Sequence, residues 1–415
     1  MQGAFLALLW VRNWDQQIPL FLGIYFVSFL AYGVAARLAI SGAFDSLARL
    51  APSIFICAVL FRLTIFWCPP TLSQDIYRYI WDGRVQASGL NPYEYPPEAP
   101  QLTALRDENF EKISYKWLRT TYPPAAEILF HLLARTGDLH IFKLGILCFD
   151  LLLIEVLRRL LKKENLSPAF LLLYAWHPLP IIEFAGSGHM DVLGISLLLT
   201  SYLLLLSTRN SAAGATLAFA ALTKYIPVFG VPWMIRKGGW KFLGGLAVAL
   251  LVLLLPYYTP DLLMIEGLHT YYRKWRFNDS LFGIFYAWFG GAEPARHWGL
   301  FFVITTTVLC WVARYSFYRS LFMIYGAIIL FSPVVHPWYI CWIIPFLVFH
   351  PNGPWLFFSG WVALSYLILY LFSAGVWKEV LWLKLLIYVP LYAMLFWNLF
   401  RAHRNRVAEQ AVTAE

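Results

Sequence analysis

Residues 73–95, SQDIYRYIWDGRVQASGLNPYEY, are rich in acidic and aromatic side chains and directly follow an apolar stretch. If this run begins as a helix, Asp75, Arg78 and Asp82 share one face. A carboxylate beside aromatic rings can accept a hydroxyl proton while the rings stack on a sugar. Asp75 is therefore the candidate base, and the candidate contacts to a sugar or acceptor are Arg78, Trp81 and Asp82. The simpler alternative is a membrane-interface belt of Tyr and Trp, with Asp75 and Arg78 as a surface ion pair.

Composition places these residues in a membrane protein. Of 415 residues, 60% are hydrophobic and 13% are charged, whereas soluble domains carry about 25% charged residues. Because a spanning helix needs about 20 apolar residues, the sequence predicts one all-α polytopic domain, residues 1–415, with about 11–13 transmembrane helices. The expected spans lie at roughly 17–38, 49–68, 140–161, 167–186, 190–207, 211–235, 240–257, 298–315, 318–333, 338–350, 354–372 and 380–400.

Basic residues in short loops predict the orientation, because such loops stay cytoplasmic. Arg158, Lys237 and Arg401 mark the cytoplasmic side. The opposite, periplasmic or outer, face then receives the segments richest in Asp, His, Trp, Tyr and Arg: the large loop 69–139, the turn 186–190, the second loop 258–297 and the turn around His336. We therefore expect a multi-pass protein of the inner membrane whose active site lies on the outer face.

Two segments are unlike simple spans. The stretch 211–235 lies between Arg209 and Lys237, which both look cytoplasmic, and it contains prolines that interrupt helical hydrogen bonding. It is therefore predicted to be a broken helical hairpin, while 338–350 is a doubtful single span. Residues 120–134 read TTYPPAAEILFHLLA and predict a second juxtamembrane helix, because about 10 apolar residues after the prolines are too few to span.

Charge and cysteine content exclude other classes. Much of the basic excess behind the net charge of +9 lies in the cytoplasmic turns and the tail, so nucleic acid is not an expected partner. The five cysteines lie in or beside apolar segments without paired spacing, which predicts neither a disulfide framework nor a zinc site.

Five short motifs carry a resemblance to a known family. They read SQDIYRYIWDGRV, GLNPYEYPP, TYPP, SGHMD at residues 187–191 and SPVVHPWY at residues 332–339. Together they resemble the bacterial polyprenyl-phosphate-mannose-dependent mannosyltransferases, a group within the GT-C membrane glycosyltransferases. The first motif is specific in residue type and spacing, whereas each of the others is weak alone.

The resemblance implies a GT-C type bundle whose large outer loop bears juxtamembrane helices. It implies inverting transfer of a sugar, expected to be mannose, from a polyprenyl-phosphate donor to an envelope glycan or glycolipid. An acid in the first outer loop serves as base, and by motif position this is Asp75. The implied partners are membrane lipids, the lipid-linked donor and the acceptor.

A second polar cluster lies in the turn IIEFAGSGHMD, residues 181–191. Glu183, His189 and Asp191 could hydrogen-bond the sugar or acceptor, hold a divalent cation together with Asp75, or cap the following helix. In enzymes of the resembled group a second outer acid helps hold the acceptor or a cation, which favours Asp191. Two acids and one His would be a sparse metal site, so metal use stays open.

Cations are the expected partners of the donor phosphate. Lys224 lies inside an apolar stretch, where a charge is costly and usually functional. Arg273 in YYRKWRFNDS, His336 in HPWY and Tyr122 in TYPP complete the predicted phosphate-binding set. The simpler alternatives are snorkelling by Lys224 and headgroup anchoring by Arg273.

Two other classes of protein would have the same predicted helices. A transporter or flippase of a lipid-linked sugar would also contain intramembrane charges and broken helices. No internal repeat is visible, and the acids cluster in an outer loop. A non-catalytic partner in an envelope-assembly complex would have no use for Asp75.

Overall fold

The computed structural model describes residues 1–44, 50–135, 137–371 and 380–413. Within these ranges the chain is helical, and one isolated bridge, between Phe277 and Val334, is the only strand-like pairing. The protein is thus an all-α polytopic membrane protein, which confirms the predicted fold class.

Five apolar segments in the described ranges are long enough to cross a membrane: Trp14–Ile40, Ile226–Tyr257, Ala292–Val312, Gly353–Leu371 and Leu381–Asn405. A sixth forms if Pro168–Ala175 and Pro178–Gly186, which meet at 49°, count as one bent span. Other predicted spans are helices that are shorter or carry charge: α3 (Leu50–Phe66), α7 (Leu139–Lys163), α10 (Asp191–Leu206) and α16 (Phe317–Phe331). The doubtful stretch 338–350 contains two short helices, α17 (Pro337–Ile340) and α18 (Ile344–Leu347).

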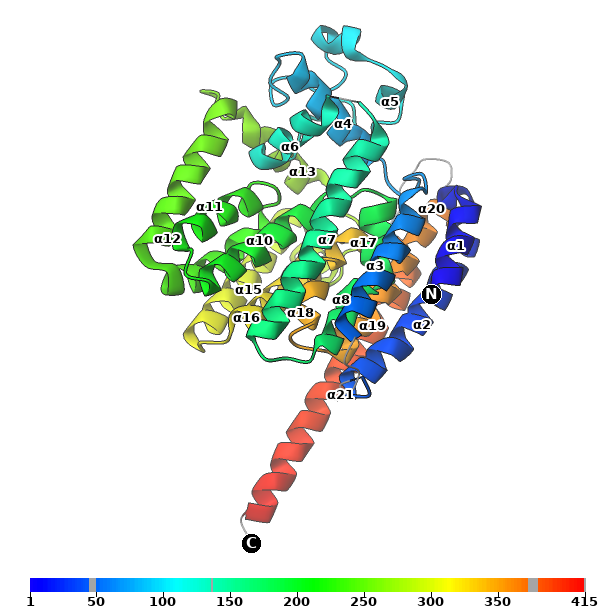
Figure 1. The fold of residues 1–415 in the computed structure, drawn as a ribbon, viewed down its shortest axis with the longest axis vertical. Helices are drawn as coiled ribbons and strands as arrows, with labels where there is room; N and C mark the ends of the chain where they lie inside the picture. The colour runs from blue at the N-terminus through cyan, green and yellow to red at the C-terminus, as the bar shows by residue number, and fades with distance from the viewer. Residues whose placement is uncertain (45–49, 136, 372–379, 414–415) are drawn as a thin grey trace.

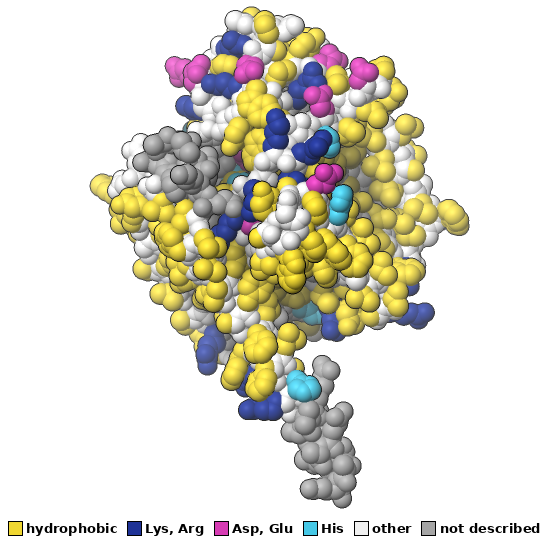
Figure 2. Space-filling model, turned by 180° about the vertical axis from the view of Figure 1, so that it is seen from behind, with side chains coloured by type: hydrophobic (Ala, Val, Ile, Leu, Met, Phe, Trp, Pro, Cys, Tyr) yellow, Lys and Arg dark blue, Asp and Glu magenta, His cyan; other side chains and the backbone are white. Residues whose placement is uncertain are grey.

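The helices run side by side, with a cap at one end of the bundle (Figure 1). The cap, residues 69–138, contains α4 (Asp75–Ala87), α5 (Glu108–Glu111) and α6 (Pro124–Ala134). At the other end the C-terminal helix α21 (Leu381–Thr413) extends beyond the bundle. Figure 2 shows a belt of hydrophobic side chains between the cap, where most of the visible acids gather, and a basic lower end.

Helices α4 and α6 lie where the two juxtamembrane helices were predicted, and they cross very closely. Gly83 allows the crossing, because a Cβ there would lie 2.3 Å from the Phe130 carbonyl oxygen. The rings of Tyr79 and Phe130 stack with centroids 4.7 Å apart. Gly83 therefore lies inside α4 as a packing site, and the rigid helix pair fixes the position of Asp75 at the start of α4.

A buried ion pair fixes α3, the helix that leads into the cap. Arg62 Nε lies 2.6 Å from the Asp150 carboxylate, and both side chains are fully buried. The Tyr174 hydroxyl donates to the same carboxylate, and Arg62 donates to the Ala175 carbonyl oxygen. This network joins α3, α7 and α8 (Leu172–Ala175), and each group satisfies the others in the interior.

The stretch 211–235 forms a broken helical hairpin, as predicted. Helix α11 (Asn210–Ala221) forms the first arm of the hairpin. The Asn210 side-chain amide donates to the Gly238 carbonyl oxygen over 3.1 Å, so the two ends of the stretch lie together. Gly239, at φ 58°, then reverses the chain inside α12 (Val231–Leu254). Lys224 lies at the tip of this hairpin, toward the cap.

The segment 258–297, predicted to be the second outer loop, lies on the same side of the bundle as the cap. Its helix α13 (Glu266–Lys274) packs so closely that a Cβ on Gly267 would lie 2.2 Å from the Thr120 carbonyl oxygen. Arg119 of the cap pairs with Glu266. The structure thus brings the two predicted outer loops together.

Cysteine labelling checks which membrane face carries the cap. In a Cys-free background, we expect Glu108→Cys in the cap to react with an impermeant maleimide from the periplasmic side only. We expect Lys163→Cys, at the far end of α7, to react only after the membrane is opened, because basic turns stay cytoplasmic. Both positions are exposed, which makes them a matched pair. The opposite pattern would invert the topology.

Candidate active site

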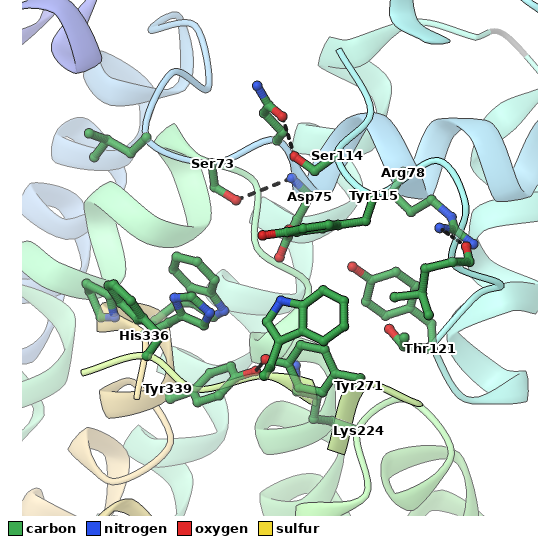
Figure 3. A pocket seen from close by; sticks show the side chains of 18 of the residues that line it. Ser73, Asp75, Arg78, Ser114, Tyr115, Thr121, Lys224, Tyr271, His336 and Tyr339 are labelled. Carbon is green, nitrogen blue, oxygen red and sulfur yellow. Dashed lines mark hydrogen bonds between the residues drawn. The ribbon is translucent and has the colours of Figure 1, made fainter. Parts of the chain in front are cut away.

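A cavity of about 600 Å³ opens between the cap, the hairpin tip and the segment before α17. Five of the side chains predicted from the sequence line it: Asp75, Arg78, Tyr122, Lys224 and His336. Figure 3 shows the Asp75 side chain pointing into this space, with Tyr115 beside it and with His336 and Tyr339 on another wall. Segments more than 250 residues apart in the chain therefore meet at one site.

Asp75 and Asp15 are the acidic residues that line the cavity, and Asp75 is the one predicted from the sequence. It begins α4, and its backbone N–H donates to the Ser73 hydroxyl over 3.2 Å. The side chain is 41% exposed, but toward the cavity, with protein around it. Desolvation by the surrounding protein raises the pKa of Asp75 to about 6, and the charge of Asp191 raises it further, whereas Lys224 and a hydrogen bond with Ser73 oppose the rise. The Asp75 carboxylate is therefore a stronger base than an ordinary aspartate.

The raised pKa predicts an acidic limb in the rate profile. Below about pH 6 Asp75 is protonated and cannot accept a hydroxyl proton, so kcat/KM should fall about tenfold per pH unit. Above that pH the carboxylate is ionised and the rate should level off. Initial rates of sugar transfer measured across this range, with melting temperature recorded at each pH, check the expectation. A flat profile through pH 6 would exclude Asp75 as the titrating base.

The alternative of an Asp75–Arg78 ion pair is wrong, because Arg78 pairs with Asp82. The Arg78 Nε lies 2.8 Å from both Asp82 oxygens, and another guanidinium nitrogen donates to the Leu118 carbonyl oxygen. Asp82 and Trp81 are buried and do not line the cavity. The Trp81 ring packs against Phe110 inside the cap. Of these three candidate sugar contacts, only Arg78 reaches the cavity.

The second polar cluster lies behind Asp75. Glu183, His189 and Asp191 are almost completely buried and do not line the cavity. Gly188, with φ +75°, turns the chain between the two helices, and a Cβ there would lie 2.5 Å from the Ile76 side chain. This close approach brings His189 Nδ1 to 3.6 Å from Asp75 Oδ2.

In the described ranges, no group of three or more His, Cys, Asp or Glu side chains is placed to hold a metal ion. Asp191 instead accepts a hydrogen bond from the Trp342 indole over 2.7 Å.

Lys224 forms an ion pair with Asp191 and also lines the cavity. Its Nζ lies 3.0 Å from Asp191 Oδ1 and above the rings of Tyr339 and Trp342. A side-chain exposure of 20% leaves part of the ammonium side chain open to a ligand. Lys224 is therefore held at the cavity wall by a buried acid and two rings.

The segment 258–297 contributes Arg276 to the cavity, and not the predicted Arg273. Arg273 is exposed and does not line the cavity, whereas Arg276 does. Arg276 pairs with Asp279 over 2.8 Å. Backbone hydrogen bonds from Phe277 N–H to Pro333 and from Val335 N–H to Phe277 attach this loop to the His336 segment.

An aromatic wall completes the cavity, and sequence reasoning missed it. The Trp275 ring lies 4.8 Å from Tyr115 and 5.2 Å from Tyr271, measured between ring centroids. The hydroxyl groups of Tyr271 and Tyr339 lie 3.0 Å apart. These rings come from three separate segments, so the only available signal was the abundance of Trp and Tyr in the outer loops.

A polytopic helical protein with a basic carboxylate, cations and aromatic rings around one cavity has the features of a membrane enzyme that acts on sugars. Residues 10–236 match the family described as alpha-(1->6)-mannopyranosyltransferase, N-terminal domain, and the chain belongs to this family. This finding confirms the resemblance to membrane mannosyltransferases.

A curated relative is alpha-(1->6)-mannopyranosyltransferase A of Corynebacterium glutamicum. It is 25% identical to this chain over 204 residues, which cover 44% of the chain and 38% of the relative. The chain therefore spans well under half the length of that relative.

Proposed function

We propose that this protein is an inverting GT-C type mannosyltransferase. It moves mannose from a polyprenyl-phosphate donor to a hydroxyl group of an envelope glycan or glycolipid. The observation that carries the proposal is Asp75, a carboxylate with a pKa raised to about 6 that opens into a cavity of about 600 Å³ with aromatic and cationic walls. The family of the chain supports mannose as the sugar.

The groups around the cavity support a single displacement at the anomeric carbon. Asp75 accepts the proton of the acceptor hydroxyl, and the oxygen forms a bond to the anomeric carbon as the bond from that carbon to the phosphate oxygen breaks. The lipid phosphate leaves with its negative charge. Lys224, Arg276 and Arg78 line the same cavity, and their charge favours the leaving phosphate.

The donor and the location are parts of the same proposal. Apolar side chains, among them Leu268, Ile368 and Leu369, line the cavity together with the polar groups, which suits a substrate with a lipid and a sugar part. The basic residues Arg158 and Lys237 lie away from the cap in the sequence-derived topology. We place the active site on the outer face of the inner membrane.

A transfer assay separates this function from a flippase. The purified protein in liposomes would receive polyprenyl-phosphate [¹⁴C]mannose and a mannose-containing glycolipid acceptor. Labelled acceptor should accumulate, with loss of label from the donor. Movement of the intact donor between leaflets, without any labelled acceptor, would instead indicate a flippase and overturn the proposal. A protein that does neither would be a non-catalytic partner.

A further inference from the structure

His189 lies between two carboxylates, one at each ring nitrogen. Its Nδ1 is 3.6 Å from Asp75 Oδ2, and its Nε2 is 3.6 Å from Glu183 Oε2. Within the described ranges, both ring nitrogens and Glu183 Oε2 are buried without a hydrogen-bond partner. Buried polar atoms normally have partners, because leaving one unpaired is costly. Closing these two gaps by less than 1 Å would satisfy all three atoms.

A stack of rings fixes the plane of the His189 imidazole. The ring stacks on Trp338 with centroids 3.9 Å apart and planes 16° apart. Trp338 in turn stacks on His336 at 4.2 Å, and His336 stacks on Phe277 at 4.7 Å. The imidazole therefore cannot turn easily, and its two nitrogens stay directed toward the two acids.

The charges around the cluster favour a neutral imidazole. Burial lowers the pKa of His189, and the nearby Lys224 and His336 lower it further. Lys224 and Asp191 neutralise each other across 3.0 Å. The Glu183 side chain is fully buried, and in the described ranges the only donor to its carboxyl group is the Tyr366 hydroxyl, at 2.7 Å from Oε1. A neutral, protonated Glu183 avoids a second unpaired charge beside Asp75. Further titratable groups near Asp75 are the phenols of Tyr79, Tyr115, Tyr122, Tyr271 and Tyr339.

We propose that His189 is the positioning residue of the base. Its Nδ1–H donates to Asp75 Oδ2, and its Nε2 accepts from the protonated Glu183. Oδ2 is thereby occupied, and Oδ1 is the oxygen that takes the acceptor proton. Glu183 sets the tautomer and Tyr366 holds Glu183. This inference rests on the proposed function, because it assigns a role only if Asp75 is the base.

The proposal predicts opposite results for two polar substitutions of His189. An Asn amide nitrogen occupies nearly the place of Nδ1, whereas a Gln amide nitrogen reaches the place of Nε2. His189→Phe keeps a stacked ring but loses the donor, so transfer should fall about 10- to 100-fold, the usual effect of one hydrogen bond to a charged group. His189→Asn should recover most of this loss, and His189→Gln should not.

The pH profile gives a readout that a purely structural role would not move. A hydrogen bond to the ionised carboxylate stabilises that form. Its loss in His189→Phe should shift the acidic limb to higher pH than in the wild type, while His189→Asn should keep the wild-type limb. An unshifted limb and a normal rate in His189→Phe would overturn the proposal. Equal losses in Asn and Gln would point to a proton relay through both nitrogens, which would also overturn it.

Asp75→Asn is assayed beside these variants to separate the two proposals. If Asp75→Asn transfers sugar normally, the assignment of the base itself fails. If Asp75→Asn is inactive while His189→Phe is normal, only the positioning role fails. Melting temperatures of all variants are measured, and activity is expressed per folded protein, because His189 is fully buried.

Discussion

Asp75→Asn is expected to lower mannosyl transfer by a factor of roughly 10²–10⁴, the usual contribution of a general base. The amide has the same size as the carboxylate but cannot accept the hydroxyl proton. Among the described residues, no Lys or Arg lies within ion-pair distance of Asp75, and its side chain is 41% exposed, toward the cavity. The variant should therefore fold normally and lose mainly kcat.

Initial rates of transfer from a polyprenyl-phosphate mannose donor test this expectation. Asp261→Asn provides a matched control, because Asp261 is an exposed acid outside the cavity. The control should transfer sugar at the normal rate. Normal transfer by Asp75→Asn would show that another group is the base.

Lys224→Met should weaken donor binding and also destabilise the protein. Loss of one charge-assisted hydrogen bond to the phosphate corresponds to about 1.5–3 kcal/mol, or roughly 10- to 100-fold in Kd. The substitution also leaves Asp191, which is 1% exposed, without its cation at 3.0 Å. Breaking a buried pair in this way costs up to about 3–5 kcal/mol, and the 20% exposure of Lys224 favours the lower part of that range.

A double variant separates the two effects. Lys224→Met with Asp191→Asn removes the unpaired charge, and the Asn side-chain oxygen can still accept from the Trp342 indole. Thermal stability should recover, whereas donor affinity should stay low. If donor affinity also recovers, Lys224 acts only on Asp191, and the phosphate is held by other cavity residues such as Arg276, Arg78 or His336.

The local pattern of the sequence predicted the elements well. Apolar stretches predicted the helices of the bundle, because a span requires a continuous apolar run. The spacing in residues 73–95 predicted α4, and its first acid, Asp75, does reach the cavity. Prolines and flanking basic residues predicted the hairpin that carries Lys224.

The composition of loops did not predict which side chains point into the cavity. Arg273 and Arg276 are three residues apart and have the same charge, but only Arg276 lines the cavity. The difference arises from backbone pairing between Phe277 and the segment 333–335, which orients the loop. An irregular loop has no period that would reveal this orientation.

By itself, the sequence determined an all-α membrane protein, a candidate base and a family resemblance, because apolar runs, helical spacing and motifs are local properties. Only the tertiary structure decided how the polar residues are distributed between the cavity and the interior. The turn at Gly188 and the stack through Trp338 place His189 behind Asp75, and the hairpin brings Lys224 to Asp191. These contacts join distant segments, and packing of the whole bundle selects them.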